Sequence, residues 1–229
     1  MNSAAHELLL TADGSHTLRS KRFGVTYHSI HGAVHESRHV FMQAGIEAIR
    51  TPATTELSIL EMGFGTGLNA LLVRQFAENY PAINVHYRTY ELFPLDEAAA
   101  ANLNYASEIG VPRAELDQLH GLPWEGEQVI VPNFTFVKHQ RSFLDEGERP
   151  YAPASVDVIF YDAFAPGSQP ELWTKTAMEI CYAALRPGGV LVTYCAKGQF
   201  KRDLRAAGFR VEAIPGPPKK REMTRAWRD

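Results

Sequence analysis

The segment LSILEMGFGTGLN at residues 57–69 restricts the fold of this chain more than any other part of it. Its apolar run stops at three alternating glycines, which predicts a buried strand that ends in a tight turn. The pattern that follows, TGLNALLVRQFAENYP, is helical and ends at Pro81. Gly63, Gly65 and Gly67 allow positive φ angles and a close approach of the backbone to a ligand. A strand, a glycine turn and a helix in this order predict the start of an α/β fold with a ligand at the turn.

Further strands are expected at residues 83–92, 134–139, 156–162 and 190–196, with helical patterns between them. Alternation of this kind predicts a mostly parallel twisted sheet with helices on both faces, closed by an antiparallel hairpin around PGPPKKRE. Asp13-Gly14 indicates a second hairpin near the N-terminus, and HVFMQAGIEAIR at 39–50 indicates a helix. Residues 104–132 show no regular pattern. We therefore expect a small β/α extension over residues 1–50 and a single globular domain over residues 51–229.

The composition, with 45% hydrophobic and 21% charged residues, is that of a globular chain and excludes a disordered or fibrous one. The N-terminus lacks a secretory signal, and no apolar run reaches the roughly 18 residues of a membrane span. Cys181 and Cys195 form no C-x-x-C pair and fall in segments expected to be buried, which predicts reduced core thiols. A cytoplasmic location is the resulting expectation.

The distribution of charge is more informative than the net value of −3, which gives no whole-protein argument for nucleic acid. From Lys197 to the end there are ten Lys/Arg and four Asp/Glu, on an otherwise acidic chain. A basic end of this kind steers a polyanion to one face, or it forms a solvated surface helix and tail. Charge alone leaves both readings open.

Glu91 supports a ribose-containing ligand at the glycine turn. It ends the second strand of the β-α-β unit, where an acidic side chain accepts hydrogen bonds from both ribose hydroxyls. A dinucleotide fingerprint would read G-x-G-x-x-G/A, but here the third glycine comes one residue early and Leu68 takes the small position. The turn also lacks the Lys-Ser/Thr of a phosphate-binding loop. A three-glycine turn followed by an acid is typical of S-adenosylmethionine-dependent methyltransferases.

Asp162 ends the apolar run VDVIFYD at the same edge of the predicted sheet. A carboxylate buried there without a partner would cost several kcal/mol, so we expect a functional role, with a surface position or a helix cap as the alternatives. An alkylamine is neutral in about one molecule in a thousand at pH 7, a cost of about 4 kcal/mol. Asp162 would therefore orient an acceptor N–H and accept or relay its proton. Phe164 and Pro166 would form an apolar wall where a sulfonium lies against an aromatic face.

Several blocks together resemble one family. LEMGFGTGLNALL, YELFPL, FYDAFAPGSQPELW, LRPGGVLVTYCAKGQFKRDLRAAGF and GPPKKREM, with HGAVHESRHVF near the N-terminus, are similar to the tRNA 5-aminomethyl-2-thiouridine methyltransferases. These are the methyltransferase half of bifunctional MnmC and its stand-alone form, MnmD. The resemblance covers roughly residues 23–226 and implies a Rossmann-like class I methyltransferase.

The implied activity is S-adenosyl-L-methionine-dependent N-methylation of the aminomethyl group on the wobble uridine of tRNA. On this reading Asp162 is catalytic and tRNA is the partner, with a separate oxidase or other modification enzyme supplying the aminomethyl substrate. The basic residues Lys219, Lys220 and Arg221 would contact RNA phosphate. The cofactor-binding set comprises Glu61, Gly63, Gly65, Gly67, Asn69, Glu91 and Phe164.

The chain departs from the family pattern in two places. His139 and Gln140 stand where an acid that binds the adenine amino group is common, so that contact stays unassigned. Pro217 and Pro218 replace a more flexible loop and are expected to stiffen it. A third feature, the run His28, His31, His35 and His39, has no supporting cysteine, and we expect no metal site there.

Three other functions fit parts of the pattern. A small-molecule amine methyltransferase or an aminopropyltransferase related to spermidine synthase shares the fold, although APGSQP lacks the additional acids that a polycation requires. An NAD-dependent dehydrogenase is disfavoured by the position of the third glycine. A cofactor-binding module without catalysis is disfavoured because both Asp162 and Glu91 are present.

Overall fold

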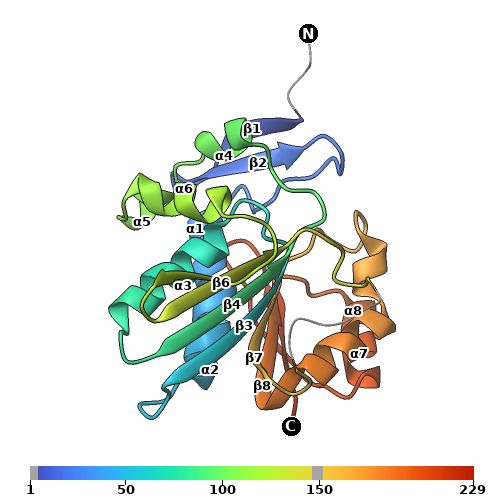
Figure 1. Ribbon diagram of the computed structural model, residues 1–229. Coiled ribbons are helices and arrows are strands. Elements are labelled where there is room, and N and C mark those ends of the chain that lie inside the picture. Colours follow the sequence, from blue (N-terminus) through green and yellow to red (C-terminus); the bar gives the residue numbers. More distant parts are fainter. Residues whose placement is uncertain (1–4, 146–151) are drawn as a thin grey trace.

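An eight-stranded sheet forms the centre of the molecule in the computed structural model, which describes residues 5–145 and 152–229 (Figure 1). The strand order is β5-β6-β4-β3-β7-β8-β10-β9. The five strands from β6 to β8 are parallel, and β5, β10 and β9 each run antiparallel to their sheet neighbours. The strands are β3 (Glu56–Met62), β4 (Asn84–Tyr90), β5 (Gln128–Val131), β6 (Phe134–His139), β7 (Val156–Tyr161), β8 (Leu185–Thr193), β9 (Arg210–Pro215) and β10 (Glu222–Trp227).

The order of the strands fixes where a ligand can bind. The chain leaves β3 to form β4 on one side and returns to form β7 on the other, so β3 is the point at which the winding reverses. Ligands of such sheets bind beyond the carboxyl ends of the strands at this point. The inner strands are apolar along nearly their whole length, as β7 shows with six buried residues, because helices cover both faces.

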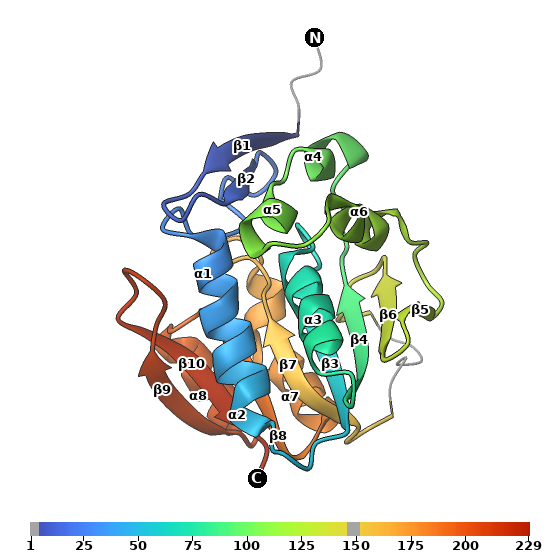
Figure 2. The ribbon, with the colours of Figure 1, turned by 90° about the vertical axis from the view of Figure 1, so that its left-hand side faces the viewer.

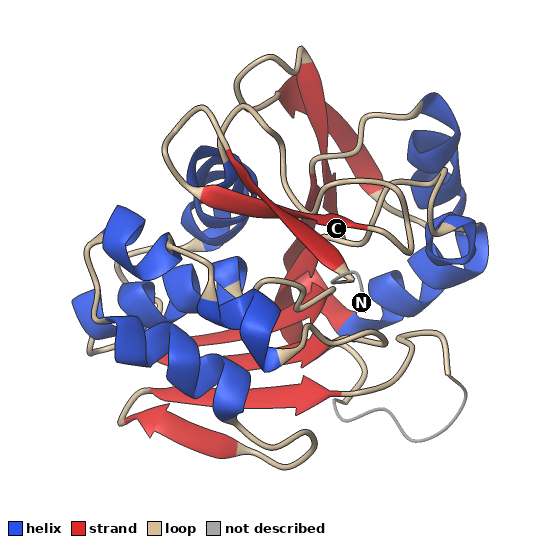
Figure 3. Cartoon of the chain, turned by 90° about the horizontal axis from the view of Figure 1, so that it is seen from above, coloured by secondary structure: helices blue, strands red, loops and turns tan. Residues whose placement is uncertain are grey.

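Helices cover the two faces of the sheet (Figures 2 and 3). One face carries α3 and a continuous helix in which α1 is followed by the π-helical segment η1 and then by α2. Gly45 brings this helix close to the sheet, since a Cβ there would lie 3.1 Å from Val192 and 3.2 Å from Val158. The opposite face carries α7 and α8. Their bounds are α1 (Ala33–Ser37), η1 (Arg38–Ile46), α2 (Glu47–Ile49), α3 (Leu68–Asn79), α7 (Lys175–Ala184) and α8 (Gly198–Ala206).

A smaller layer lies over the carboxyl ends of the parallel strands (Figure 2). It contains the antiparallel pair β1 (His6–Leu10) and β2 (His16–Ser20) and the short helices α4 (Glu97–Ala101), α5 (Tyr105–Ile109) and α6 (Arg113–Gly121). The Asn104 side chain ties these parts together, since its Oδ1 accepts from the His16 N–H at 2.7 Å and its Nδ2 donates to the Gly14 carbonyl at 2.9 Å. This layer roofs the edge at which the sheet binds a ligand.

The predicted fold class and both hairpins are confirmed, and three local predictions are wrong. The first helix begins at Ala33 instead of residue 39, because Gly32 takes a φ of 135° before it and Asp13 accepts a hydrogen bond from the His35 N–H. Residues 104–132 contain α5, α6 and β5. The segment RPGG at 186–189 lies in the first half of β8 and does not end a helix. Gly188 and Gly189 both form backbone hydrogen bonds with Arg228.

The division of the chain at residue 50 stays an interpretation. Residues 33–49 are part of the main core, where Val40, Phe41 and Ile46 are fully buried with residues of β7 and β8. Within residues 5–50, β1, β2 and the segment that follows them lie in the smaller layer, outside the sheet and its covering helices (Figure 2).

Candidate active site

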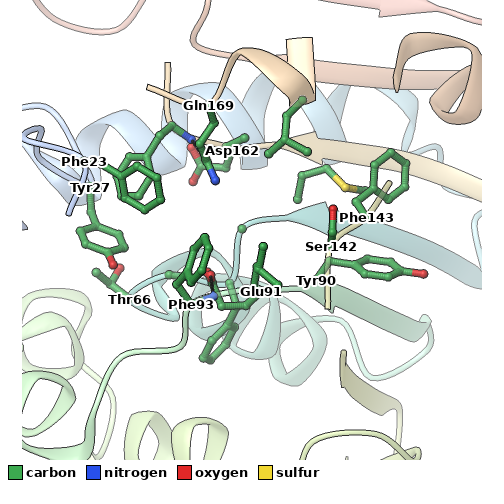
Figure 4. A pocket seen from close by; sticks show the side chains of 18 of the residues that line it. Phe23, Tyr27, Thr66, Tyr90, Glu91, Phe93, Ser142, Phe143, Asp162 and Gln169 are labelled. Carbon is green, nitrogen blue, oxygen red and sulfur yellow. Dashed lines mark hydrogen bonds between the residues drawn. The ribbon is translucent and has the colours of Figure 1, made fainter. Parts of the chain in front are cut away.

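A cavity of about 830 Å³, including its open mouth, lies beyond the carboxyl ends of β3, β4 and β7 (Figure 4). Five segments form its walls: the glycine turn after β3, residues 90–93, residues 141–143, the loop after β7, and Phe23, Tyr27 and His28 from the N-terminal layer.

The glycine turn forms the floor of the cavity. Gly63, Gly65 and Gly67 have φ values of 92°, 49° and 75°, a region that favours glycine. A Cβ on Gly63 would lie 3.0 Å from the carbonyl oxygen of Asp162, and one on Gly65 would lie 3.1 Å from the ring of Tyr27. Gly67 is the N-cap of α3 and does not line the cavity. The first two glycines therefore permit close packing around the site, and the third starts the helix.

Glu91 joins the glycine turn to the end of β4. Its Oε2 accepts from the Gly65 N–H at 2.9 Å, and its Oε1 accepts from the Phe93 N–H at 2.8 Å. Each carboxylate oxygen has a further lone pair, so Glu91 can also accept from hydroxyl groups of a ligand in the cavity. Burial raises the pKa of Glu91, and the backbone N–H groups of Phe93, Gly65 and Leu92 act against that shift. The predicted pairing of turn and acid is present in the structure.

Asp162 lies at the opposite wall, directly after β7, and belongs to a small polar network. The Asn69 Nδ2 donates to Asp162 Oδ2 at 2.8 Å and to Glu61 Oε1 at 3.0 Å. Asn69 lines the cavity, whereas Glu61 is 1% exposed and lies behind it. One amide group thus links two carboxyl groups from neighbouring strands.

Burial sets the charge state of this network. It raises the pKa of Asp162 well above its usual range, and the nearby Glu61 and Glu36 add to the shift. Burial also raises the pKa of Glu61 to about 7. Strongly shifted carboxyl groups in a cavity are typical of catalytic sites. Asp162 can therefore hold a proton at a pH where an ordinary aspartate cannot.

Aromatic rings form the wall beside Asp162 (Figure 4). The Phe164 ring centroid is 4.7 Å from that of Phe23 and 4.8 Å from that of Tyr27. Two hydrogen bonds fix the backbone of the loop after Asp162. The Gln169 side chain accepts from the Phe164 N–H at 2.9 Å, and Trp173 Nε1 donates to the Phe164 carbonyl at 2.7 Å. This explains the rigid segment APGSQPELW: it fixes an aromatic ring next to the carboxyl group.

The other end of the cavity is lined by Arg141, Ser142 and Phe143, together with Tyr90. His139 and Gln140, the two residues at the unassigned adenine position, do not line it. His139 Nδ1 and the Gln140 N–H both contact the carboxylate of Glu125. Arg141, Ser142 and Phe143, which follow these two residues in the chain, line the cavity instead.

The three residues of the predicted basic loop have different surroundings. Lys219 and Arg221 are exposed. Lys220 is partly buried, and its Nζ lies 2.6 Å from Glu36 Oε1 and 4.3 Å from the centroid of the Tyr194 ring.

No group of three or more potential His, Cys, Asp or Glu metal ligands occurs within residues 5–145 and 152–229. His28 lines the cavity, and burial lowers its pKa to about 4, so it is neutral. No helix in the part of the chain that the structure describes is long and apolar enough to cross a membrane.

Sequence reasoning identified Asp162, Glu91 and Phe164 but missed Phe23, Tyr27 and several other lining residues. RFGVTY at 22–27 has neither periodicity nor a motif that indicates a ligand site. These side chains reach the cavity only because the N-terminal layer folds over the sheet edge.

Comparison with known proteins agrees with this geometry. Residues 138–229 match the family model described as S-adenosyl-L-methionine-dependent methyltransferase. The bifunctional protein MnmC of Idiomarina loihiensis, named for tRNA 5-methylaminomethyl-2-thiouridine biosynthesis, is 32% identical over 89% of this chain. The protein of the same name from Ectopseudomonas mendocina is 34% identical over 96% of it. The chain is similar to S-adenosyl-L-methionine-dependent methyltransferases and to the two proteins named MnmC. It spans about a third of the length of these relatives, 36% and 35%.

Solved structures extend the comparison. The crystal structure of MnmC2 from Aquifex aeolicus has a TM-score of 0.77 and 25% identity, covering 99% of this chain and 71% of that one. Spermidine synthase from Thermotoga maritima has a TM-score of 0.52 and 14% identity, covering 93% of this chain and 68% of that one, which shows a common fold only. The predicted class I methyltransferase fold and cofactor are confirmed.

Proposed function

We propose that this MnmC-related chain methylates the nitrogen of a 5-aminomethyl group on the wobble uridine of tRNA. The observation that carries the proposal is a carboxyl group, Asp162, at the wall of the cavity that holds the glycine turn and Glu91. The names of the two MnmC relatives support the substrate. The exposed Lys219 and Arg221 in the loop between β9 and β10 support an RNA partner.

The cavity fits S-adenosyl-L-methionine at three places. Glu91 has lone pairs for ribose hydroxyls, and the glycine turn leaves the floor open to a close approach. Tyr90, Ser142 and Phe143 would surround the adenine, and Phe164 would face the sulfonium. When bound, the cofactor supplies a methyl group on a positively charged sulfur.

Asp162 would prepare the acceptor nitrogen. An amine that arrives as an ammonium ion forms an ion pair with an ordinary carboxylate and keeps its proton. The raised pKa of Asp162 changes this balance, because a buried carboxyl group gains from taking the proton. The ammonium N–H bond breaks, the proton binds to a carboxylate oxygen of Asp162, and the nitrogen recovers its lone pair. Asp162 then orients that nitrogen by accepting a hydrogen bond from a remaining N–H at its other carboxyl oxygen, which leaves the lone pair free.

Asn69 and Glu61 would act through Asp162. The amide of Asn69 fixes the Asp162 carboxyl group, and the buried Glu61 fixes the amide. Glu61 lies behind Asn69, so we assign it an indirect role in place of the cofactor contact expected from the sequence.

The test is mass analysis of wobble nucleosides from tRNA that carries unmethylated 5-aminomethyl-2-thiouridine, after incubation with the protein and methyl-labelled cofactor. We expect the label on the aminomethyl nitrogen with the wild-type protein, and at least about 100-fold slower labelling with Asp162→Asn. Parallel reactions with spermidine, putrescine and the free nucleoside test the alternative of a small-molecule amine methyltransferase. Label on those amines and none on tRNA would contradict the proposal.

A further inference from the structure

Lys220 differs from its two basic neighbours because its charge is directed into the protein. Its Nζ lies 2.6 Å from Glu36 Oε1, and the side chain of Glu36 is 8% exposed compared with 35% for that of Lys220. The same Nζ is 4.3 Å from the centroid of the Tyr194 ring, a cation–π distance. Lys219 and Arg221 on either side of it are exposed. A lysine held in this way is poorly placed to bind a phosphate on the outside.

The turn that carries Lys220 is stiff. The Lys220 N–H donates to the Pro217 carbonyl at 2.9 Å, and Lys219 has a φ of 70°. Pro218 at the second position and a positive φ at the third are the arrangement of a type II turn. Lysine seldom takes such a φ, which is usual for glycine or asparagine. The backbone therefore fixes the direction in which the Lys220 side chain leaves the hairpin.

The Glu36–Lys220 pair lies directly behind the wall at the Asp162 end of the cavity. On one side, Glu36 Oε2 accepts from the Ser29 N–H at 2.7 Å, and His28, next to Ser29, lines the cavity. On the other side, the Tyr194 hydroxyl donates to the Ala163 carbonyl at 2.8 Å, and Ala163 also lines the cavity. The pair thus joins α1 and the β9–β10 loop, residues 184 positions apart in the sequence, at this wall.

Carboxyl groups crowd this end of the molecule. Glu36 and Glu61 both raise the pKa of Asp162, and Lys220 lowers it. The other polar or titratable groups near Asp162 come from separate elements: Asn69 of α3, Tyr87 of β4, Tyr105 of α5 and Tyr194 after β8. Asn69 and the tyrosines carry no positive charge that would offset Glu36. An uncompensated Glu36 would hold an acceptor amine in its ammonium form.

We propose that Lys220 is a positioning residue of the acceptor site, which neutralises Glu36 and fixes the loop at 216–221, and that it does not bind RNA phosphate. The inference rests on the proposed function for the identity of the acceptor. The charge of Glu36 affects catalysis only if the acceptor is an amine that must lose a proton. Lys219 and Arg221 keep the role of RNA contacts.

The experiment compares Lys220→Met with the matched variant Lys219→Met, and adds Glu36→Gln and the double variant Glu36→Gln/Lys220→Met. The first readout is a carbon-13 NMR titration of the Asp162 carboxyl group in the whole 229-residue chain, with Asp162→Asn for assignment. It requires neither RNA nor activity. The second is the salt dependence of tRNA binding, and the third is the pH dependence of methyl transfer.

We expect Lys220→Met to raise the pKa of Asp162 and Lys219→Met to leave it unchanged. The double variant should return that pKa to the wild-type value or below, because no unpaired charge remains. It also serves as the folding control if Lys220→Met alone is unstable. Lys219→Met should lower the salt slope of tRNA binding by about 0.7 to 1, and Lys220→Met should not change it. The acid limb of methyl transfer should move to higher pH in Lys220→Met only.

A lower salt slope in Lys220→Met, with an unchanged Asp162 titration, would overturn the inference. If instead the titration shifts as expected but the wild-type protein methylates no tRNA, the charge compensation stands and the proposed function fails.

Discussion

The two ends of the cavity are built in different ways. Most of the proposed cofactor end comes from one continuous segment, from β3 through the glycine turn to Glu91 directly after β4, and Ser142 and Phe143 complete it from the segment after β6. The acceptor end combines Phe23 and Tyr27, Asp162 and Phe164, and support from Glu36 and Lys220. The first end follows a compact motif, and the second exists only after the chain has folded.

Because the two ends are built from different segments, we expect cofactor binding and methyl transfer to depend on different residues. Substitutions at the cofactor end should change affinity for the cofactor, and substitutions at the acceptor end should change the rate of methyl transfer. The predictions below test whether the two ends are separable in this way.

The largest effect is expected for Asp162→Asn. Asparagine keeps the size of the side chain but cannot take a proton from the acceptor, so the methyl-transfer rate should fall by about 10²- to 10⁴-fold. Cofactor affinity, measured by calorimetry, should stay within a factor of about three, which is within about 0.7 kcal/mol. An equal loss of affinity and rate would mean that Asp162 belongs to the cofactor end.

Glu61→Gln should change how stability depends on pH. The native pKa of Glu61 is raised from 4.5 to about 7, so its contribution to stability is present below pH 4.5 and is lost as the pH rises through 7. The loss is at most about 3 kcal/mol, and the variant should not show it. Urea unfolding at pH 5 and pH 8 measures the free energy of unfolding.

Glu212→Gln is the matched control for that experiment. The nearby Trp227 side chain and the hydrogen bonds from Arg225 and Arg210 lower the pKa of Glu212 to about 2, so its contribution has the opposite sign and is lost as the pH falls through 2. A Glu61→Gln protein with the same slope as wild type between pH 5 and 8 would exclude the buried, proton-binding state of Glu61.

Glu91→Gln should weaken cofactor binding by about 10- to 100-fold, because hydrogen bonds to a charged group contribute about 1.5–3 kcal/mol. The rate at saturating cofactor should change much less. Equilibrium binding and initial rates over a range of cofactor concentrations separate the two effects, and Glu97→Gln on the exposed side of α4 is the control. If Glu91→Gln lowered the rate at saturating cofactor as much as Asp162→Asn does, the two ends of the cavity would not have separate roles in binding and catalysis.

Gly63→Ala tests the contact between the glycine turn and the backbone of Asp162. The added Cβ would lie 3.0 Å from the Asp162 carbonyl at a φ of 92°, so we expect a loss of about 1–3 kcal/mol in the free energy of unfolding. Gly167→Ala is the control, since a Cβ there has no atom within 4 Å. Equal stability of the two variants would show that the glycine turn is not packed against the Asp162 backbone.

The sequence predicted the parts of the fold that have a local physical cause. Apolar runs predict the inner strands, and the glycine turn with Glu91 predicts one wall of the cavity, since each signal depends on neighbours in the chain. Phe23 and Tyr27 could not be found in this way, because their contact with Phe164 spans more than 130 residues and leaves no periodic signal.

Lys220 shows the same limit. The run Lys219, Lys220 and Arg221 is uniform in the sequence, and only the turn at Pro217 and Pro218 gives the middle residue a different direction. Glu36, its partner, lies on α1, and nothing in the sequence around it indicates that it pairs with Lys220. Charge that is paired in the fold cannot be distinguished from free charge by composition.

The most direct test of the account is a crystal structure with S-adenosylhomocysteine and a 5-aminomethyl-2-thiouridine nucleoside bound together. We expect the ribose hydroxyls of the cofactor product at Glu91 and the aminomethyl nitrogen about 2.6–3.2 Å from a carboxylate oxygen of Asp162. A complex in which Asp162 faces away from that nitrogen, or in which the nucleoside binds outside the cavity, would contradict the account.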